Sequence, residues 1–234
     1  MRPYFLAAVT LVGLSGFAMQ SEAATLSTRV YEDGVLQTAF SQSSAAGALV
    51  LIGPTTNFSQ IIFTGFGSGL IDDGSLIGQT TVISSAANFT GTHTLRLELT
   101  QTDLSSASVG GLFAQLATTL TANLLVNGNN IRDVMISSYA DAGNGAFATS
   151  TLLATDTYNG AGANASPLMT TAAALGNALF SETLVITATF AQGGATLNAS
   201  AQVTAVPVPE PASIALFSTG LVAVGMLIRR RRQD

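Results

Sequence analysis

The clearest structural signal in the chain is the stretch Thr92-His93-Thr94-Leu95-Arg96-Leu97-Glu98-Leu99-Thr100, in which apolar and polar residues alternate. Successive side chains of a β-strand face opposite ways, so the three leucines lie on one face. Arg96 and Glu98 lie on the other face. A slip of one residue in strand pairing would bury both charges, so the stretch predicts a half-buried strand in a fixed register.

Similar short runs flank this stretch and are separated by turn residues. Asp33-Gly34 predicts a tight hairpin turn between Thr28–Tyr31 and Val35–Thr38. Asn127-Gly128-Asn129-Asn130 and Gly193-Gly194 predict two more hairpins. Their strands would be Thr118–Val126 with Ile131–Ser138 and Thr183–Phe190 with Leu197–Val203, and single strands are expected at Ala48–Ile52, Gln60–Phe66 and Leu76–Ser84.

Four segments have a weaker pattern. Asp103–Gln115 leaves room for a short helical turn, and Phe147–Tyr158 fits one long strand or a strand pair. Asn159–Ser166 reads as a flexible loop, and Ala172–Leu179 favours a helix locally. About nine to eleven short strands without alternating helices predict an all-β fold, an antiparallel β-sandwich with jelly-roll or immunoglobulin-like topology.

The C-terminal segment Pro207–Asp234 has a different composition. The string Val208-Pro209-Glu210-Pro211 is stiffened by its prolines and predicts an exposed tether. The uncharged residues Ala212–Ile228 follow, and as a helix they would span roughly 25 Å, near the lower limit for crossing a bilayer. The cluster Arg229-Arg230-Arg231-Arg232 then predicts a cytoplasmic stop, because arginine is costly to carry across a membrane.

This order of features closely resembles the PEP-CTERM sorting signal of Gram-negative bacteria. The resemblance covers about the last 28 residues, from Pro207 to Asp234. It implies recognition and cleavage near Pro209-Glu210-Pro211 by a membrane-embedded exosortase, in cells that make exopolysaccharide. The alternative reading is an ordinary tail anchor, in which Pro211 and Glu210 merely begin the helix.

The N-terminal segment Met1–Ala23 is built like a secretory signal peptide. Arg2 supplies the positive end, an apolar run follows, and the small residue Ala23 favours cleavage directly after it. The sequence therefore predicts three parts: a signal peptide at 1–23, a β-sandwich ectodomain at 24–205 and a sorting signal at 206–234.

The composition of the ectodomain excludes some kinds of site and argues against some classes of partner. The whole chain has no cysteine, which excludes disulfides and thiolate metal sites. Ten carboxylates against three arginines and no lysine make the ectodomain acidic. An acidic, lysine-free surface argues against nucleic acid and anionic lipid, which both need cationic contacts.

Few residues suit catalysis. His93 is the only histidine, and no Gly-x-Ser-x-Gly motif accompanies it, so we expect a partly buried histidine at a sheet rim rather than a catalytic triad. Asp72-Asp73, Asp141 and Asp156 are the carboxylates that a glycosidase could pair. We expect no catalytic residues and no enzyme activity.

Two kinds of binding remain open. Asp141-Ala142-Gly143-Asn144-Gly145 resembles half of an oxygen-ligand loop for calcium, although the distal glutamate of an EF-hand is missing. No other cofactor or metal is expected, zinc included. Tyr139 and Tyr158 border polar loops and could stack on a sugar, or could cap the sandwich with their hydroxyls in water.

The sequence thus predicts an exported, non-enzymatic cell-surface or extracellular-matrix protein. Its expected partners are an exosortase, the inner membrane before processing and exopolysaccharide afterwards, and not nucleic acid. One alternative is a carbohydrate-binding module for the cell's own polysaccharide. A second alternative is a secreted polysaccharide-active enzyme.

Overall fold

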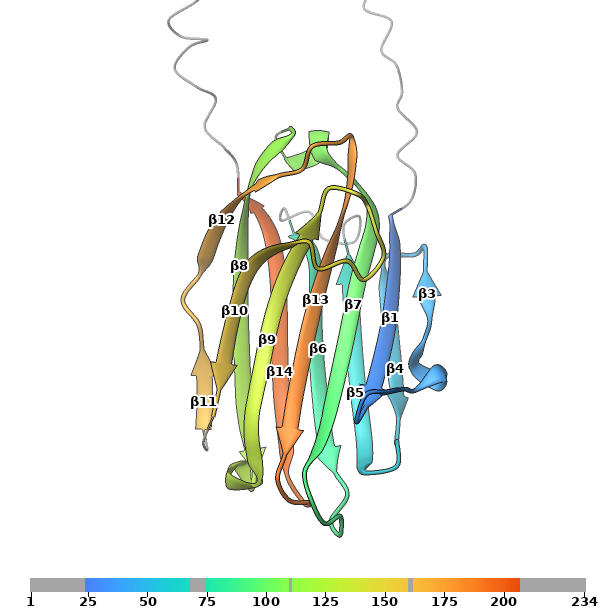
Figure 1. Cartoon of the computed structure of the whole chain (residues 1–234), viewed down its shortest axis with the longest axis vertical. Coiled ribbons are helices and arrows are strands. Elements are labelled where there is room, and N and C mark those ends of the chain that lie inside the picture. The colour runs from blue at the N-terminus through green and yellow to red at the C-terminus, as the bar shows by residue number, and fades with distance from the viewer. Residues whose placement is uncertain (1–23, 68–74, 110, 160–161, 207–234) are drawn as a thin grey trace, which may run out of the picture.

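The computed structural model describes residues 24–67, 75–109, 111–159 and 162–206. They form two stacked antiparallel sheets of seven strands each, which confirms the predicted all-β class (Figure 1). Sheet A has the order β10-β9-β13-β7-β1-β2, with β3 also paired to β1. Its strands are β1 (Thr25–Glu32), β2 (Val35–Leu36), β3 (Ser43–Ser44), β7 (His93–Ser105), β9 (Ile131–Asp141), β10 (Thr151–Tyr158) and β13 (Leu179–Phe190).

Sheet B has the order β11-β8-β14-β6-β5-β4, with β12 also paired to β8. Its strands are β4 (Ala48–Gly53), β5 (Phe58–Gly67), β6 (Ser75–Ser85), β8 (Phe113–Val126), β11 (Gly162–Ala165), β12 (Met169–Ala174) and β14 (Thr196–Val206). Strands β6 to β10 and β12 to β14 have the strand order of a jelly roll: β10-β9-β13-β7 in sheet A, and β12-β8-β14-β6 in sheet B. Strands β9 and β10 form a hairpin within sheet A. The connections β6–β7, β8–β9 and β13–β14 each pass from one sheet to the other.

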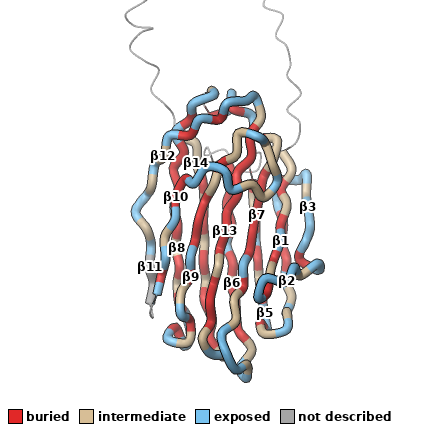
Figure 2. The backbone as a smooth tube through the Cα atoms, viewed as in Figure 1, coloured by how far each residue is buried: buried red, intermediate tan, exposed pale blue. Residues whose placement is uncertain are grey.

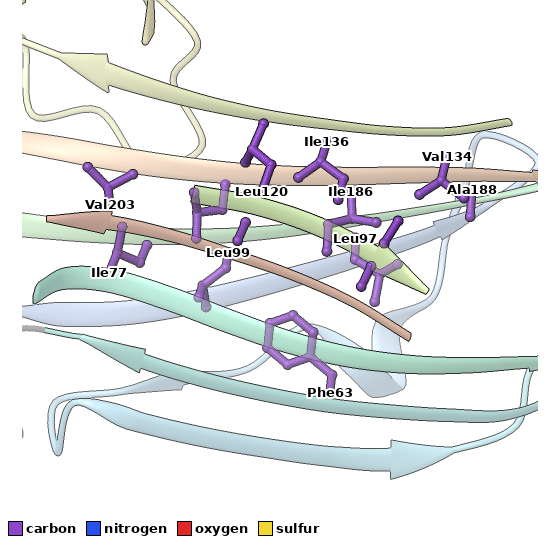
Figure 3. Close-up of a cluster of buried hydrophobic side chains, with 14 of the residues drawn as sticks. Phe63, Ile77, Leu97, Leu99, Leu120, Val134, Ile136, Ile186, Ala188 and Val203 are labelled. Atoms are coloured by element: carbon purple, nitrogen blue, oxygen red, sulfur yellow. The ribbon is translucent and has the colours of Figure 1, made fainter. Parts of the chain in front are cut away.

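The core lies between the sheets and follows the predicted alternation. Leu95, Leu97 and Leu99 of β7 are fully buried and pack with side chains from the facing sheet, among them Phe63 and Ile77 (Figure 3). Burying a side chain of this size contributes about 1.5–3 kcal/mol, so the register of the central strands is well determined. Figure 2 shows the buried stretches concentrated in the middle of both sheets.

The outer face of sheet A departs from the half-buried pattern. Arg96 is exposed, but Glu98 and Thr100 on the same face are buried. The loop joining β9 and β10, residues 142–150, crosses over β13 and β7 there (Figure 1). Ser181 of β13 donates to the Gly145 carbonyl of this loop at 2.7 Å. A loop distant in sequence therefore covers a face that the alternation predicted to be open.

Two of the three predicted hairpins are wrong. β8 and β9 follow each other at the Asn127–Asn130 turn but belong to different sheets, and so do β13 and β14 at Gly193-Gly194. Both connections are arches between the sheets. They lie against each other, since Asn130 donates through its amide to the Gly193 carbonyl at 2.8 Å. The hairpin at Asp33-Gly34 is confirmed, with positive φ at both residues.

Four smaller predictions have mixed outcomes. The helical turn within Asp103–Gln115 is confirmed as a 3-10 turn at Ser106–Val109. The helix at Ala172–Leu179 is wrong, because β12 pairs with β8 up to Ala174 and Gly176 turns the chain at φ 66°. The loop at Asn159–Ser166 contains β11, which adds an edge to sheet B. Phe147–Tyr158 is neither one long strand nor a pair, since only Thr151–Tyr158 forms a strand.

Both ends of the described chain lie at the same end of the sandwich, which we call the near end (Figure 1). Ala24 precedes β1 there, and β14 ends there at Val206. The signal peptide ending at Ala23 and the expected membrane helix Ala212–Ile228 lie outside the described residues. Among the residues that are described, none belongs to a helix long and apolar enough to span a membrane.

Candidate functional site

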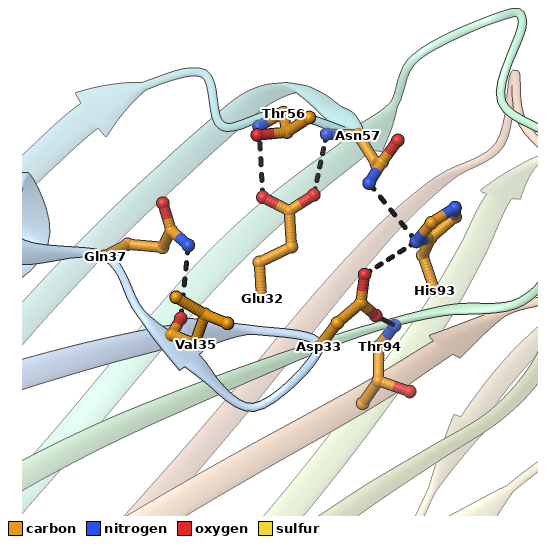
Figure 4. Close-up of polar contacts among 8 residues, drawn as sticks. All are labelled: Glu32, Asp33, Val35, Gln37, Thr56, Asn57, His93 and Thr94. Atoms are coloured by element: carbon orange, nitrogen blue, oxygen red, sulfur yellow. Dashed lines mark hydrogen bonds and ion pairs between the residues drawn. The ribbon is translucent and has the colours of Figure 1, made fainter.

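The opposite, far end of the sandwich carries a polar network around His93 (Figure 4). Asp33 follows β1 and holds two groups of β7. One carboxylate oxygen accepts from the Thr94 backbone N–H at 2.8 Å, and the other contacts His93 Nδ1 at 2.7 Å. Neighbouring Glu32 is buried and accepts from the backbone N–H groups of Thr56 at 3.0 Å and Asn57 at 2.7 Å. These contacts fasten the β4–β5 turn and the start of β7 to β1.

The tautomer of His93 follows from its neighbours. Nδ1 contacts Asp33 and also lies 3.2 Å from the Asn57 side-chain nitrogen. A carboxylate only accepts, so Nδ1–H donates to Asp33, and the same nitrogen cannot also accept from the Asn57 amide. Phe89 packs edge-on against the imidazole with the ring centres 4.8 Å apart. His93 is thus the rim histidine that the sequence predicted.

A cavity of about 440 Å³ adjoins this network and is lined by Thr56, Asn57, Ala86, Ala87, Asn88, Phe89, Thr90 and His93. Its walls hold one imidazole and no carboxylate. Asp33 could orient His93 as in a triad. No serine or threonine hydroxyl bonds to that imidazole in the part of the chain that the structure describes.

The two candidate glycosidase carboxylates that the structure describes, Asp141 and Asp156, are not brought together. Asp156 lies opposite Ile136, five residues before Asp141 on β9, which puts the two acids roughly 17 Å apart along the sheet. Glycosidase carboxyl groups lie about 5 to 9.5 Å apart. Asp156 also accepts from Ser166 and from its neighbouring backbone N–H. Asp72-Asp73 lies outside the described residues.

The candidate calcium loop is held by its own hydrogen bonds. The Asp141 carboxylate accepts from Ser150 and from the Gly145 backbone N–H, and these bonds lower the pKa of Asp141. The Asn144 amide exchanges two hydrogen bonds with Asp103, at 2.7 and 2.8 Å. The described residues contain no group of three acidic or histidine side chains placed to hold a metal ion.

The two candidate stacking tyrosines have different surroundings. Tyr158 is only 5% exposed, and its hydroxyl donates to the Leu120 carbonyl at 3.0 Å. Burial raises the pKa of Tyr158. It cannot stack on a sugar, and the hypothesis that gave it this role is wrong. Tyr139 on β9 is half-buried, opposite Leu152.

Sequence reasoning missed a second hollow, which lies on the outer face of sheet A. This outer groove has a volume of about 500 Å³ and is lined by Arg29, Tyr31, Gly34, Thr94, Arg96, Glu98, Phe147 and Thr187. Alternation already placed Arg96 and Glu98 on one face. Nothing in the sequence showed that Phe147, from the loop between β9 and β10, would close the groove at one side.

The sorting-signal residues Val208–Pro211 and the cluster Arg229–Arg232 lie outside the described residues, as does Ala23. Comparison with protein-family models matches residues 207–232 to the PEP-CTERM protein-sorting motif. The resemblance found in the C-terminal segment is thereby confirmed. Its first residue follows directly on β14, which ends at Val206.

Comparisons with curated proteins and with solved structures give no further information on function. Comparison with curated proteins gives no match. Among solved structures, the chain is similar to an arabinose-bound GH51 α-L-arabinofuranosidase, with 10% sequence identity and a TM-score of 0.31. The match covers 68% of this chain and 23% of the arabinofuranosidase chain.

Proposed function

We propose that this chain is a non-enzymatic protein that an exosortase sorts to the cell surface or extracellular matrix, where it associates with exopolysaccharide. The carrying observation is the PEP-CTERM sorting motif at residues 207–232, placed immediately after the last strand of the sandwich. That motif implies an exported protein processed by an exosortase. Inner-membrane anchoring through Ala212–Ile228 precedes processing in this proposal, with Arg229–Arg232 in the cytoplasm.

The test of sorting replaces the motif in the native host. Pro209→Ala combined with Glu210→Ala should leave the protein uncut and in the membrane fraction, because the recognised string is gone. Pro207→Ala is the matched control, since it changes a proline but leaves Pro209-Glu210-Pro211 intact. Release of the double variant at the wild-type rate would contradict the exosortase assignment.

The two ends of the mature protein provide an independent check. Intact-mass spectrometry should place the N-terminus at Ala24, after a cut behind Ala23. It should place the C-terminus close to Pro209-Glu210-Pro211. A mature protein that keeps Arg229–Arg232 would favour a plain tail anchor.

The non-enzymatic role is supported by how the histidine, a nearby buried glutamate and one candidate acid are bound. His93, Glu32 and Asp141 each bond to groups that hold turns and loops in place. Purified protein should therefore release no reducing ends from the host's exopolysaccharide. Release that disappears in Asp156→Asn or Asp72→Asn would overturn this part of the proposal in favour of a polysaccharide-active enzyme.

We propose that the sandwich also works without calcium. The oxygens of Asp141 and Asn144 already accept hydrogen bonds from the chain, so a cation would have to displace them. A ligand that binds only the folded state at one hundred times its Kd stabilises by about 2.7 kcal/mol. Millimolar calcium should therefore leave the melting temperature unchanged, and a clear upward shift would contradict the proposal.

Association with exopolysaccharide is tested in cells. The mature protein should sediment with the extracellular polymer and should be lost to the supernatant in a strain that makes no polymer. Equal amounts in the supernatant of both strains would remove exopolysaccharide as the partner while leaving the sorting assignment in place.

A further inference from the structure

We infer that the outer groove on sheet A binds an acidic sugar unit of a polysaccharide, with Arg29 holding the carboxylate and Phe147 packing against the sugar ring. This rests on the proposed function only in taking a polysaccharide as the partner. The groove is open on the face of the sandwich, away from the core.

Strand register sets the polar pattern of the groove. On the outer face, Arg29 of β1 lies directly opposite Glu98 of β7, and Tyr31 lies directly opposite Arg96. Thr187 of β13 adjoins Arg96 from the other side. Three neighbouring strands thus present guanidinium, phenol, carboxylate and hydroxyl groups within one hollow of about 500 Å³, which is within the usual size range of ligand sites.

The two arginines of the groove are not equivalent. Arg96 forms an ion pair with Glu98, which is buried. Arg29 instead lies over the Phe147 ring, 3.9 Å from its centre, and has no carboxylate partner among the described residues. Guanidinium groups bind carboxylates through two parallel hydrogen bonds. Arg29 is therefore the cation that can receive an anionic ligand.

The charge around the groove contrasts with the rest of the ectodomain. Of the three ectodomain arginines, Arg29 and Arg96 line the groove, and Arg132 is paired with Asp133 on β9. The ectodomain is otherwise acidic. With Glu98 counted, the groove keeps one net positive charge, so it favours an anionic ligand over a neutral one.

Phe147 is held in a strained position by the loop that carries it. Its φ of 59° is unusual for a bulky residue and is retained only where the surroundings enforce it. Three hydrogen bonds hold the loop in this conformation: Asp141 with Gly145, Ser181 with Gly145, and Asn144 with Asp103. The loop backbone that carries the ring is held before any ligand arrives, which lowers the entropic cost of binding.

The ligand class follows from these groups together. A sugar ring presents an apolar C–H face that fits against an aromatic ring, and hydroxyls that bond to groups such as Thr187 and Thr94. A uronic acid adds the carboxylate that Arg29 can hold. A small inorganic anion would use Arg29 but would not fill a hollow of about 500 Å³ that Tyr31 and Phe147 also line.

The experiment uses the full chain purified in detergent and calorimetric titration with a galacturonate hexasaccharide. The matched probe is the same hexasaccharide with every carboxylate methyl-esterified, and it should bind at least tenfold more weakly. Arg29→Gln and Phe147→Gly should each weaken binding of the acidic probe at least tenfold. Glycine at position 147 relieves the positive-φ strain, so this variant should fold, and its melting curve checks that it does.

Arg132→Gln is the control, because it removes an exposed arginine outside the groove and should bind as wild type does. The cluster Arg229–Arg232 is present in every variant, so differences among them report the groove. Wild-type binding in both groove variants, or no preference for the acidic probe, would overturn the inference. Co-sedimentation with the polymer in cells would survive that result, so failure of the groove is distinguishable from failure of the proposed function.

Discussion

Glu182 is the residue whose surroundings conflict most with its chemistry. It lies on β13 opposite Gln101, it is fully buried, and its two carboxylate oxygens have no hydrogen-bond partner among the described residues. Desolvation raises the pKa of Glu182 to about 8, so the side chain is neutral in the folded protein near pH 7. A carboxyl group is thus kept protonated by the sandwich core.

The pH dependence of stability follows from this shift. In the unfolded chain the carboxyl ionises near its ordinary pKa of 4.5, and in the folded protein near 8. Between these values the folded state binds one more proton, so the free energy of unfolding falls as pH rises, by about 1.4 kcal/mol per pH unit. Below pH 4.5 both states are protonated and the penalty vanishes.

Glu182→Gln removes the ionisation while keeping the shape. The variant should match wild type in urea denaturation at pH 4.5 and should exceed it in stability by several kcal/mol at pH 8. Arg132→Gln, at an exposed ion pair, should change stability by less than about 0.5 kcal/mol at either pH. A constant difference between Glu182→Gln and wild type across this range would show that Glu182 is not neutral in the fold.

At the scale of elements, the loop of residues 142–150 depends on Asp141. Hydrogen bonds from Ser150 and Gly145 lower the pKa of Asp141, so its contribution to stability is present above pH 3.8 and is lost as pH falls through the lower folded value. Asp141→Asn should reduce the melting temperature at pH 7 by about 2–4 °C, equivalent to roughly 1 kcal/mol.

The same variant tests whether the loop positions Phe147. Asp141→Asn should weaken binding of the acidic hexasaccharide although Asp141 does not line the groove. As pH falls below 3.8, its melting temperature should approach that of wild type, because the unfolded wild-type chain then binds a proton that folded Asp141 resists. An unchanged melting temperature at pH 7 would show that the loop is held by its other contacts alone.

The arch between β13 and β14 packs closely against the β6–β7 connection at one glycine. A Cβ atom on Gly193 would collide with the Ala86 backbone carbonyl, which cannot rotate away as a side chain could. Gly193→Ala should therefore cost about 1–3 kcal/mol or more. Gly34→Ala is the comparison, because a Cβ there meets nothing within 4 Å and only the positive φ of 81° is penalised. Urea denaturation should rank Gly193→Ala as the less stable variant.

The arches also show which part of the fold could not be predicted from the sequence. The strands were predictable because their alternation is local, and β4, β5 and β7 begin within two residues of their expected starts. The pairing partners of β8, β9, β13 and β14 could not be predicted, because a glycine or asparagine turn permits both a hairpin and an arch. The choice depends on which sheet completes the core, which is set by contacts far apart in the sequence.

The candidate site, too, could be predicted only where it depends on local sequence. His93 was correctly expected at a rim, since its place at a strand start is a local property. The outer groove was not expected, because Phe147 reaches Arg29 across more than a hundred residues of sequence. Tyr158 was given a surface role because it borders a polar loop, yet β8 offers the Leu120 carbonyl to its hydroxyl.

At the scale of the whole molecule, the position of the ends, together with the proposed anchoring, predicts how the sandwich would stand on a membrane. The start of β1 and the end of β14 lie at the near end, while the arches and the start of β7, which is His93, lie at the far end (Figure 1). The proposed membrane helix begins at Ala212, a few residues after β14. The far end would therefore point away from the bilayer, with the outer groove on the side of the molecule and open to polymer.

This orientation can be measured because the chain has no cysteine, so single cysteines can be labelled without background. Ala107, in the 3-10 turn after β7, is exposed at the near end, and Asn129, in the arch after β8, is exposed at the far end. Between them β8 runs for 14 residues. Such a strand spans roughly 45 Å.

Ala107→Cys and Asn129→Cys, each carrying a fluorophore on the uncut chain in vesicles, should differ in quenching by lipid-attached quenchers. The near-end label lies within reach of the headgroups, whereas the far-end label stands beyond short-range contact, so quenching should be strong for Ala107→Cys and weak for Asn129→Cys. Iodide in solution should quench both equally, because both positions are exposed. Equal quenching by the lipid would mean that the sandwich lies flat, which would bring one sheet face, rather than one end, against the membrane.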